Sequence, residues 1–148
     1  MKIKDSQKTY VPTNADLQRK WFIVDVKGKT LGQISTKIAN ILRGKDKVHF
    51  TTQLDCGDYV VAINAKEVRL AGNKMDTKLY HWHTRYPGGL RTRTARELLN
   101  RKPEKILFDS VFGMLPRNKL RSKIIKKFRV FPGETHEHTA QKLQPIEL

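Results

Sequence analysis

Two short apolar runs in the first half of the chain predict buried strands. Residues 21–26 (WFIVDV) combine aromatic and β-branched side chains, and residues 59–64 (YVVAIN) are apolar at nearly every position. Such residues favour strands, and an almost unbroken apolar run is typical of a strand that is buried on both faces, as in a parallel sheet. We therefore expect both runs to be strands of a parallel sheet.

The segment between these runs has the spacing of an amphipathic helix. Its apolar residues recur three or four positions apart, and they are Leu31, Ile34, Ile38, Ile41 and Leu42. Lys27 and Gly28 form a turn before them, and Gly44 after them is a helix-stop signal. A strand, a helix and a second strand at this spacing predict a βαβ unit.

The second half of the chain predicts further helices around an irregular segment. Thr94–Glu97 is a capping box that opens one helix, and Pro103 opens another that is expected to end at Gly113. Residues 80–91 contain a Pro-Gly-Gly turn and are expected to be the least regular part of the chain. The segment 129–131 is a short strand candidate.

A third helix is expected near residues 119–128, with a polar face that is entirely cationic. Its apolar stripe consists of residues four positions apart, which are Leu120, Ile124 and Phe128. The opposite side carries three lysines, which are Lys119, Lys123 and Lys126.

Helices and strands in this order predict an α/β fold with a small, mostly parallel sheet. Residues 1–19 are polar and are interrupted by Pro12, so we expect them to form an extended N-terminal arm. Residues 20–148 are then a single α/β domain with an irregular C-terminal tail. The length of 148 residues suits one domain of this kind.

The net charge indicates a protein that binds a polyanion. Thirty basic and 14 acidic residues give a formal net charge of +16. Such a charge repels itself and is most easily understood if a polyanion neutralises it. Nucleic acid is the first candidate partner, and an anionic membrane surface is the second. Residues 111–131 carry seven basic and no acidic groups, which indicates a contact surface there.

The cations and polar groups expected to bind RNA lie in four places. They flank the turn after the first strand, follow the first helix, occupy the irregular segment and accompany the cationic helix. They are Lys27, Lys29, Arg43, Lys45, Lys47, His81, His83, Arg85, Arg91, Arg117, Asn118, Lys119, Lys123, Lys126 and Lys127. The rings of Tyr80 and Trp82 are expected either to stack on bases or to fill the core.

Other chemistries have weaker support in the sequence. Gly28-Lys29-Thr30 stands where a phosphate-binding loop would be, but the required earlier glycine is replaced by Ile23. Two His-x-His pairs have no second cysteine near them, so no metal or other cofactor is expected. A nuclease that uses Asp55, Asp58 and a histidine is the rival from the enzyme class.

Composition also bears on the cellular compartment and on membrane association. Cys56 is the single cysteine, which fits a reducing compartment. No apolar stretch approaches the ~18 residues of a membrane span, and the start has no apolar run typical of a secretory signal. We therefore expect neither a membrane-spanning nor a secreted protein. A membrane partner is not expected either, because no amphipathic helix has bulky apolar residues beyond those needed for the core.

Several blocks follow one another in a specific order and spacing along the chain. They are Trp21–Gly32, Arg43–Lys47, Gly57–Val61 with Asn64 and Ala65, Arg85–Leu90, Gly113–Pro116 and His136–Gln141. In these blocks the chain resembles a known family, large ribosomal subunit protein thirteen, in its bacterial or organellar form. The resemblance covers residues 19–141.

The resemblance implies a fold and a role. The family fold is a three-layer α/β/α domain with a small, mostly parallel sheet. The family binds large-subunit ribosomal RNA directly, joins the particle early in assembly, contacts neighbouring large-subunit proteins and has no catalytic activity. A cytoplasmic location in a bacterial ribosome is expected, with an organellar ribosome as the alternative, and no small-molecule substrate is expected.

Overall fold

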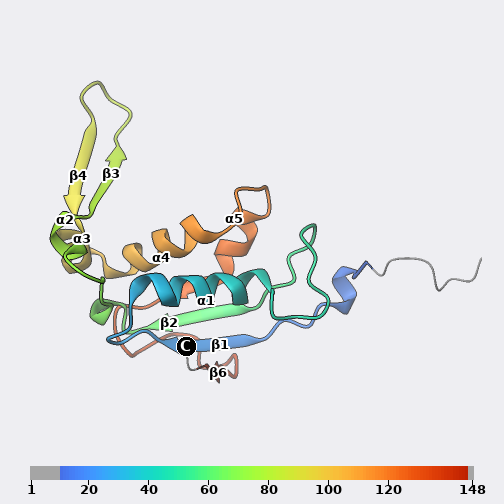
Figure 1. Ribbon diagram of the computed structural model, residues 1–148. Helices are drawn as coiled ribbons and strands as arrows, with labels where there is room; N and C mark the ends of the chain where they lie inside the picture. The colour runs from blue at the N-terminus through green and yellow to red at the C-terminus, as the bar shows by residue number, and fades with distance from the viewer. Residues whose placement is uncertain (1–10, 147–148) are drawn as a thin grey trace, which may run out of the picture.

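A four-stranded sheet lies at the base of the fold in the computed structural model, which describes residues 11–146 (Figure 1). Its strand order is β5 (Phe128–Val130), β2 (Tyr59–Ile63), β1 (Trp21–Asp25) and β6 (Gln144–Pro145), and every neighbouring pair is parallel. Both apolar runs are therefore strands, with Trp21 opposite Tyr59. The prediction of an α/β fold with a small, mostly parallel sheet and flanking helices is confirmed.

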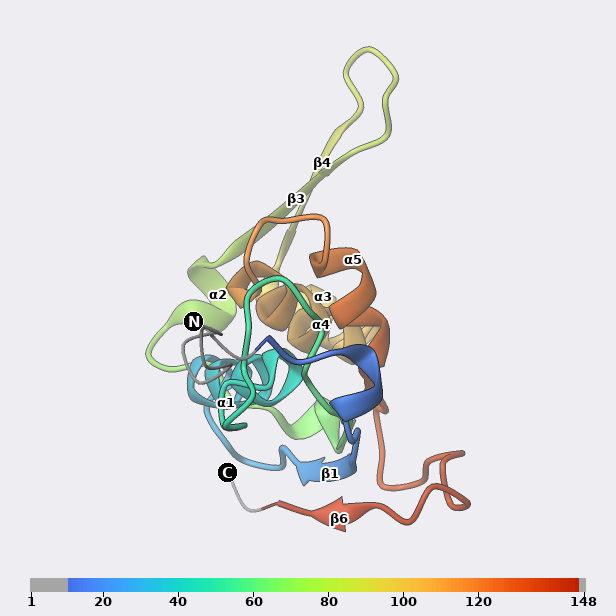
Figure 2. The ribbon, with the colours of Figure 1, turned by 90° about the vertical axis from the view of Figure 1, so that its right-hand side faces the viewer.

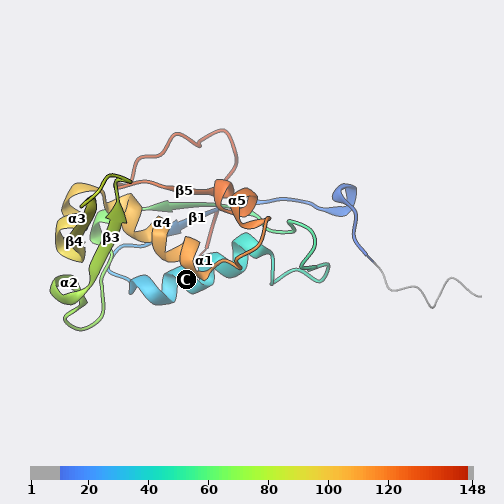
Figure 3. The ribbon, with the colours of Figure 1, turned by 90° about the horizontal axis from the view of Figure 1, so that it is seen from above.

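Two long helices run side by side against this sheet (Figure 3). The first, α1 (Leu31–Arg43), contacts β2, and the second, α4 (Pro103–Met114), contacts both α1 and β5. The helix-stop prediction is confirmed at Gly44, which has a φ of 76° and donates its N–H to the last turn of α1. Such a left-handed residue satisfies carbonyl groups that a helix end leaves without partners.

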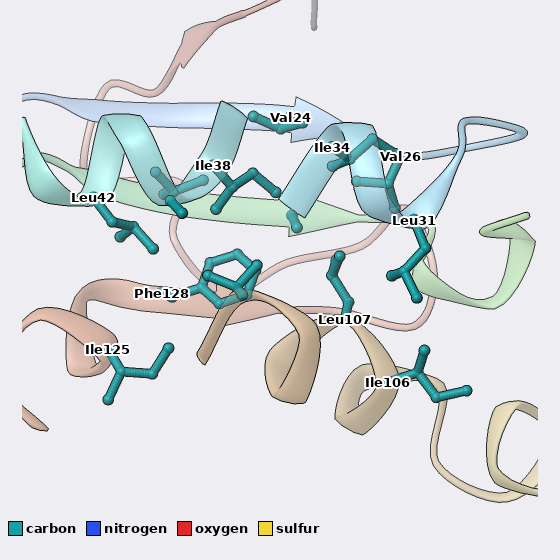
Figure 4. Packing of buried hydrophobic residues seen from close by; sticks show 14 of the residues in the cluster. Val24, Val26, Leu31, Ile34, Ile38, Leu42, Ile106, Leu107, Ile125 and Phe128 are labelled. Atoms are coloured by element: carbon teal, nitrogen blue, oxygen red, sulfur yellow. The ribbon is translucent and has the colours of Figure 1, made fainter. Parts of the chain in front are cut away.

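The hydrophobic core lies between the sheet and these two helices. Figure 4 shows Val24, Ile38, Leu42, Leu107 and Phe128 converging from β1, α1, α4 and β5. The first four of these side chains are fully buried, and Phe128 is nearly so. Removing apolar surface of this kind from water contributes about 25 cal/mol per Å² and is the main force that holds the layers together.

The other face of the sheet is covered by irregular chain from the C-terminal segment. Trp21 and Tyr59 stack on that face with ring centroids 4.3 Å apart. The ring of His138 lies 5.4 Å from Trp21 and 5.8 Å from Phe131. Burial of β2 on both faces, which its apolar run predicts, is therefore confirmed.

A β-hairpin replaces the irregular segment expected at residues 80–91. Strands β3 (Leu79–His83) and β4 (Leu90–Thr94) pair antiparallel and project from the body of the molecule (Figure 2). The prediction was wrong because the Pro-Gly-Gly turn is only the tip of this hairpin. The residues before it alternate polar and aromatic side chains, which is the period of a strand.

The remaining short elements connect these parts. They are η2 (Asn14–Asp16), η3 (Ala65–Glu67), α2 (Lys74–Thr77), α3 (Ala95–Arg101), α5 (Arg121–Ile124) and η4 (Ile125–Lys127). Helix α3 starts at the predicted capping box, where the N–H of Glu97 donates to Oγ1 of Thr94 at 3.3 Å. Residues 1–10 of the expected N-terminal arm lie outside the described residues.

The prediction of a long cationic helix at residues 119–128 is also wrong. Only the four residues of α5 are α-helical, and the chain tightens into η4 before it enters β5. The physical reason is that Phe128 must join the sheet beside β2, where it pairs with Val60. A helix continued through residue 128 would remove this strand.

Residues 44–58 return closely against the end of α1, and Gly57 makes this approach feasible. A Cβ atom on Gly57 would lie 1.8 Å from the carbonyl oxygen of Leu42. No side chain fits there without a backbone shift. This close approach places Asp55 and Asp58 within bonding distance of Lys127 and Lys47, respectively.

Candidate nucleic-acid interface

An open groove beside α5 gathers exposed cations from two distant parts of the chain. Arg19, Lys123 and Lys126 line it, and its volume is ≈ 830 Å³. All three side chains are exposed, and no described acidic side chain forms an ion pair with either lysine. Arg19 lies 3.9 Å from Asp55 through its guanidinium. The groove therefore presents uncompensated positive charge at its two lysines, which suits a phosphate backbone, whereas Asp55 in the same lining offsets part of the charge of Arg19.

Arg43 and Asn118, two of the predicted binding residues, line one small hollow next to this groove. The guanidinium of Arg43 lies 5.7 Å from the ring centre of Phe50, a distance typical of a cation–π contact. Arg117 and Lys119 flank Asn118 and are exposed, as is Lys45 beyond α1. The structure thus brings the predicted binding residues at the end of α1 and those before α5 to the same end of the molecule.

Lys127 is a correction to the predicted binding set. Its side chain is 5% exposed, and its ammonium donates to Oδ1 of Asp55 at 2.5 Å and to the carbonyl of Leu42 at 3.2 Å. Burial lowers the pKa of Lys127 below its ordinary value of 10.5, and the bond to Asp55 opposes that shift. A buried and bonded amino group cannot reach a phosphate, so its role is structural.

Lys47 forms a second ion pair of this type. Its ammonium donates to Oδ1 of Asp58 at 2.6 Å and to the carbonyl of Gln18 at 2.8 Å. The N–H of Lys20 donates to the same Asp58 oxygen at 2.8 Å. The two pairs tie residues 17–20 and the loop after α1 to the core. Asp55 and Asp58, which the nuclease hypothesis required, are therefore largely buried structural partners of lysines.

Lys27 and Lys29 lie at the opposite end of α1 from Arg43 (Figure 1). Lys27 is exposed and its ammonium lies 3.4 Å from Glu67. Lys29 lines an open cavity of ≈ 450 Å³ with Gln33 and Lys37 on the first turns of α1. These lysines therefore form a separate surface rather than an extension of the groove.

The turn that carries these lysines is held by Asp25. Its carboxylate accepts hydrogen bonds from the amide of Asn64 and the N–H of Lys27, both at 2.9 Å. These bonds hold the pKa of Asp25 below its ordinary value of 3.8. An ionised Asp25 at neutral pH thus fixes the backbone of the turn.

The hairpin separates its predicted binding residues onto two faces. The pairing puts His81 opposite Thr92, and Nδ1 of His81 lies 3.0 Å from the hydroxyl of Thr92. His83 shares that face. Arg91 is paired with Trp82 on the other face. At the tip, the N–H of Arg85 donates to Nδ1 of His83 at 2.9 Å.

Four cations at the base of the hairpin are not among the predicted binding residues. They line a cavity between the hairpin and the helices α3 and α4, and they are Arg93, Arg101, Lys102 and Lys105. One signal in the sequence points to Arg93, which follows Arg91 at the two-residue period of a strand. The other three come from the end of α3 and the start of α4, which are two separate helices, so no local spacing indicates that they meet.

Residues 11–146 contain no helix that is long and apolar enough to cross a bilayer. In the same part of the chain, no group of three or more His, Cys, Asp or Glu side chains is placed to hold a metal ion.

Comparison with known proteins gives one consistent result. The model of the family "Ribosomal protein L13" matches residues 19–137. A protein of Maridesulfovibrio salexigens named "Large ribosomal subunit protein uL13" is 49% identical over 140 residues, covering 95% of this chain and 99% of its own. Proteins of the same name from Aquifex aeolicus and Clostridioides difficile are 47% and 49% identical, over 95% and 90% of this chain and 98% and 94% of theirs.

Proposed function

Because the chain belongs to the ribosomal protein L13 family, a structural and non-enzymatic family, we propose that it binds large-subunit ribosomal RNA. In this proposal its separate cationic surfaces hold different RNA segments together and support early assembly of the subunit. Its partners are that RNA and neighbouring large-subunit proteins. Its place is a ribosome in the bacterial cytoplasm, since the relatives described above are bacterial.

The groove of Arg19, Lys123 and Lys126 is the observation that carries this proposal. Arg19 comes from a part of the chain that is distant from the two lysines, and the two lysines have no acidic partner among the described residues. Holding like charges together is unfavourable unless an anion neutralises them. A phosphate backbone supplies regularly spaced negative charge and releases counterions when it is neutralised.

Two further cationic surfaces extend the proposed RNA contact beyond the groove. The surface at the start of α1 carries Lys27 and Lys29, and the projecting hairpin carries His81, His83 and Arg91. A helix of 13 residues is about 20 Å long, so the two ends of α1 contact different phosphates. Cations this far apart suit a protein that joins RNA segments, not one that reads a single short sequence.

The proposal is tested by reversing charge beside the groove. The triple variant Lys119→Glu, Lys123→Glu and Lys126→Glu is expected to fold, because all three side chains are exposed. It is expected to enter large subunits poorly, because glutamates repel phosphates. The measurement is gradient sedimentation of lysates from cells that express the variant, with detection of the chain in each fraction.

A matched control separates position from charge. The variant Lys66→Glu, Lys74→Glu and Lys142→Glu changes the net charge equally, at exposed positions outside the proposed surfaces. It is expected to co-migrate with large subunits nearly as the unmodified chain does. Normal incorporation of the groove variant would overturn the role of the groove, and absence of the unmodified chain from large subunits would overturn the function.

A further inference from the structure

The base of the hairpin holds a cavity of ≈ 270 Å³ whose walls combine aromatic and cationic groups. Tyr80 and Trp82 come from β3, and Arg93 comes from β4. Three more cations come from the end of α3 and the start of α4, and they are Arg101, Lys102 and Lys105. Asp109 on α4 is the one carboxylate in the lining. The cavity joins parts of the chain that are nearly 30 residues apart.

One wall of this cavity carries a polar atom that the described residues leave unsatisfied. The hydroxyl of Tyr80 is buried and has no hydrogen-bond partner among residues 11–146. A buried polar group without a partner is costly, and native proteins usually provide one. Burial, with a smaller contribution from Asp109, raises the pKa of Tyr80 above 10.0, so the hydroxyl keeps its proton at neutral pH and can donate it.

Asp109 is a second polar group at the same wall. Burial raises its pKa above the ordinary value of 3.8, and Lys105 opposes that shift. Its carboxyl group offers hydrogen-bond acceptors beside the donor hydroxyl of Tyr80. A donor and an acceptor placed together match the edge of a nucleobase, which presents both kinds of group.

Trp82 adds an aromatic surface to these polar groups. The guanidinium of Arg93 lies over its ring at 4.7 Å from the ring centre. Flat guanidinium and indole groups are the platforms on which unpaired bases stack in RNA-binding proteins. The surrounding cations are suited to the phosphate that accompanies such a base.

We propose that this cavity binds one unpaired nucleotide of the RNA, with its base against Tyr80 and Trp82 and its phosphate near Arg101 and Lys105. This inference rests on the proposed function. A volume of ≈ 270 Å³ is just below the range of about 300–1,000 Å³ typical of small-molecule sites, so it suits a single base with its phosphate at the rim and excludes an RNA helix. An acidic peptide is a poorer match, because it presents no base to stack on Trp82.

Ultraviolet crosslinking tests the contact directly. The full chain is bound to protein-free RNA from bacterial large subunits, irradiated and digested, and its peptides are analysed by mass spectrometry. The expected result is a single-nucleotide adduct on Tyr80 or Trp82. The same experiment on intact large subunits is expected to give the same adduct, and a crosslink from these residues to a protein instead would overturn the proposal.

Two variants give an independent readout. Tyr80→Phe removes only the unpartnered hydroxyl, so it is expected to leave the melting temperature unchanged or slightly higher and to weaken RNA binding about fivefold. Arg101→Gln with Lys105→Gln is expected to lower affinity at least tenfold and to reduce the salt slope by about 1 to 2. The control pair Lys66→Gln and Lys74→Gln removes the same charge at exposed positions away from the cavity.

The outcomes distinguish the two proposals. Cavity variants that bind RNA as the control pair does, together with no adduct on Tyr80 or Trp82, overturn the nucleotide site and leave the proposed function intact. A loss of stability in Tyr80→Phe without a change in binding assigns the hydroxyl a structural role and has the same effect. Failure of the unmodified chain to bind the RNA overturns both.

Discussion

The ammonium of Lys127 is buried against Asp55, whereas that of its neighbour Lys126 lies in an open groove. Burial of Lys127 is tolerated because Asp55 and the carbonyl of Leu42 accept its hydrogen bonds. Removing one member of a buried pair leaves the other charge uncompensated. Two adjacent lysines therefore have opposite roles, one in stability and one on the surface.

This difference predicts opposite effects of the same substitution. Lys127→Ala is expected to lower the free energy of unfolding by about 3 kcal/mol, because it removes the buried partner of Asp55 and leaves that carboxylate only the more exposed guanidinium of Arg19 at 3.9 Å. Lys126→Ala is expected to change it by no more than about 0.5 kcal/mol and to weaken RNA binding instead. Urea unfolding and filter binding of both variants check the prediction, and equal stability of the two variants would contradict it.

The lowered pKa of Lys127 determines how this residue's contribution to stability changes with pH. Its pKa is lower in the folded state than the ordinary 10.5, so the unfolded chain binds this proton more tightly. The contribution of this group to the free energy of unfolding therefore rises as the pH increases from the folded pKa toward 10.5.

At the scale of elements, the hairpin and the central sheet are stabilised by different contacts. Strands β1 and β2 are covered on both faces, whereas β3 and β4 pair only with each other, and most of their residues are exposed. A two-stranded hairpin by itself is marginally stable in water. Its anchoring comes from the base, where Tyr80 packs against the hydrophobic core.

Hydrogen exchange is expected to report this difference. In the free protein, backbone amides of the outer hairpin, near His83 and Leu90, are expected to exchange much faster than those of β1 and β2. Bound RNA is expected to slow exchange in the hairpin, because it covers the strands. Exchange-mass spectrometry with and without the RNA measures both effects. Hairpin protection equal to that of the central sheet in the free protein would show that the hairpin has another source of stability.

At the scale of the whole molecule, the positive charge is divided among surfaces at both ends of α1 and on the hairpin. A net charge of +16 on 148 residues thus acts at several places at once. Binding that neutralises many phosphates releases many counterions, and its affinity therefore depends strongly on salt.

The expected salt effect is large. A chain that contacts six or more phosphates loses about a thousandfold or more in affinity between 50 and 200 mM salt. Filter binding of the full chain to large-subunit ribosomal RNA over this range measures the slope. A loss of less than tenfold would indicate that few phosphates are contacted and that the separate surfaces do not act together.

Local patterns in the sequence were enough for the central part of the fold. The strands β1 and β2, the helix α1 and the cap at Gly44 follow from spacing and residue type over a few neighbours. The positive charge and the ordered blocks of the family resemblance are also properties of the sequence alone. These features need no information about which distant residues meet.

Only the tertiary structure decided which cations are available to a partner. Lys127 is bonded to Asp55, which is 72 residues away in the chain, and no local pattern indicates that contact. The hairpin faces depend on which residue of β4 pairs with which residue of β3, and the cavity at its base depends on how the hairpin sits on α4. Exposure and charge compensation are set by contacts between distant segments, so the sequence determined how much positive charge there is and the fold determined where it is free.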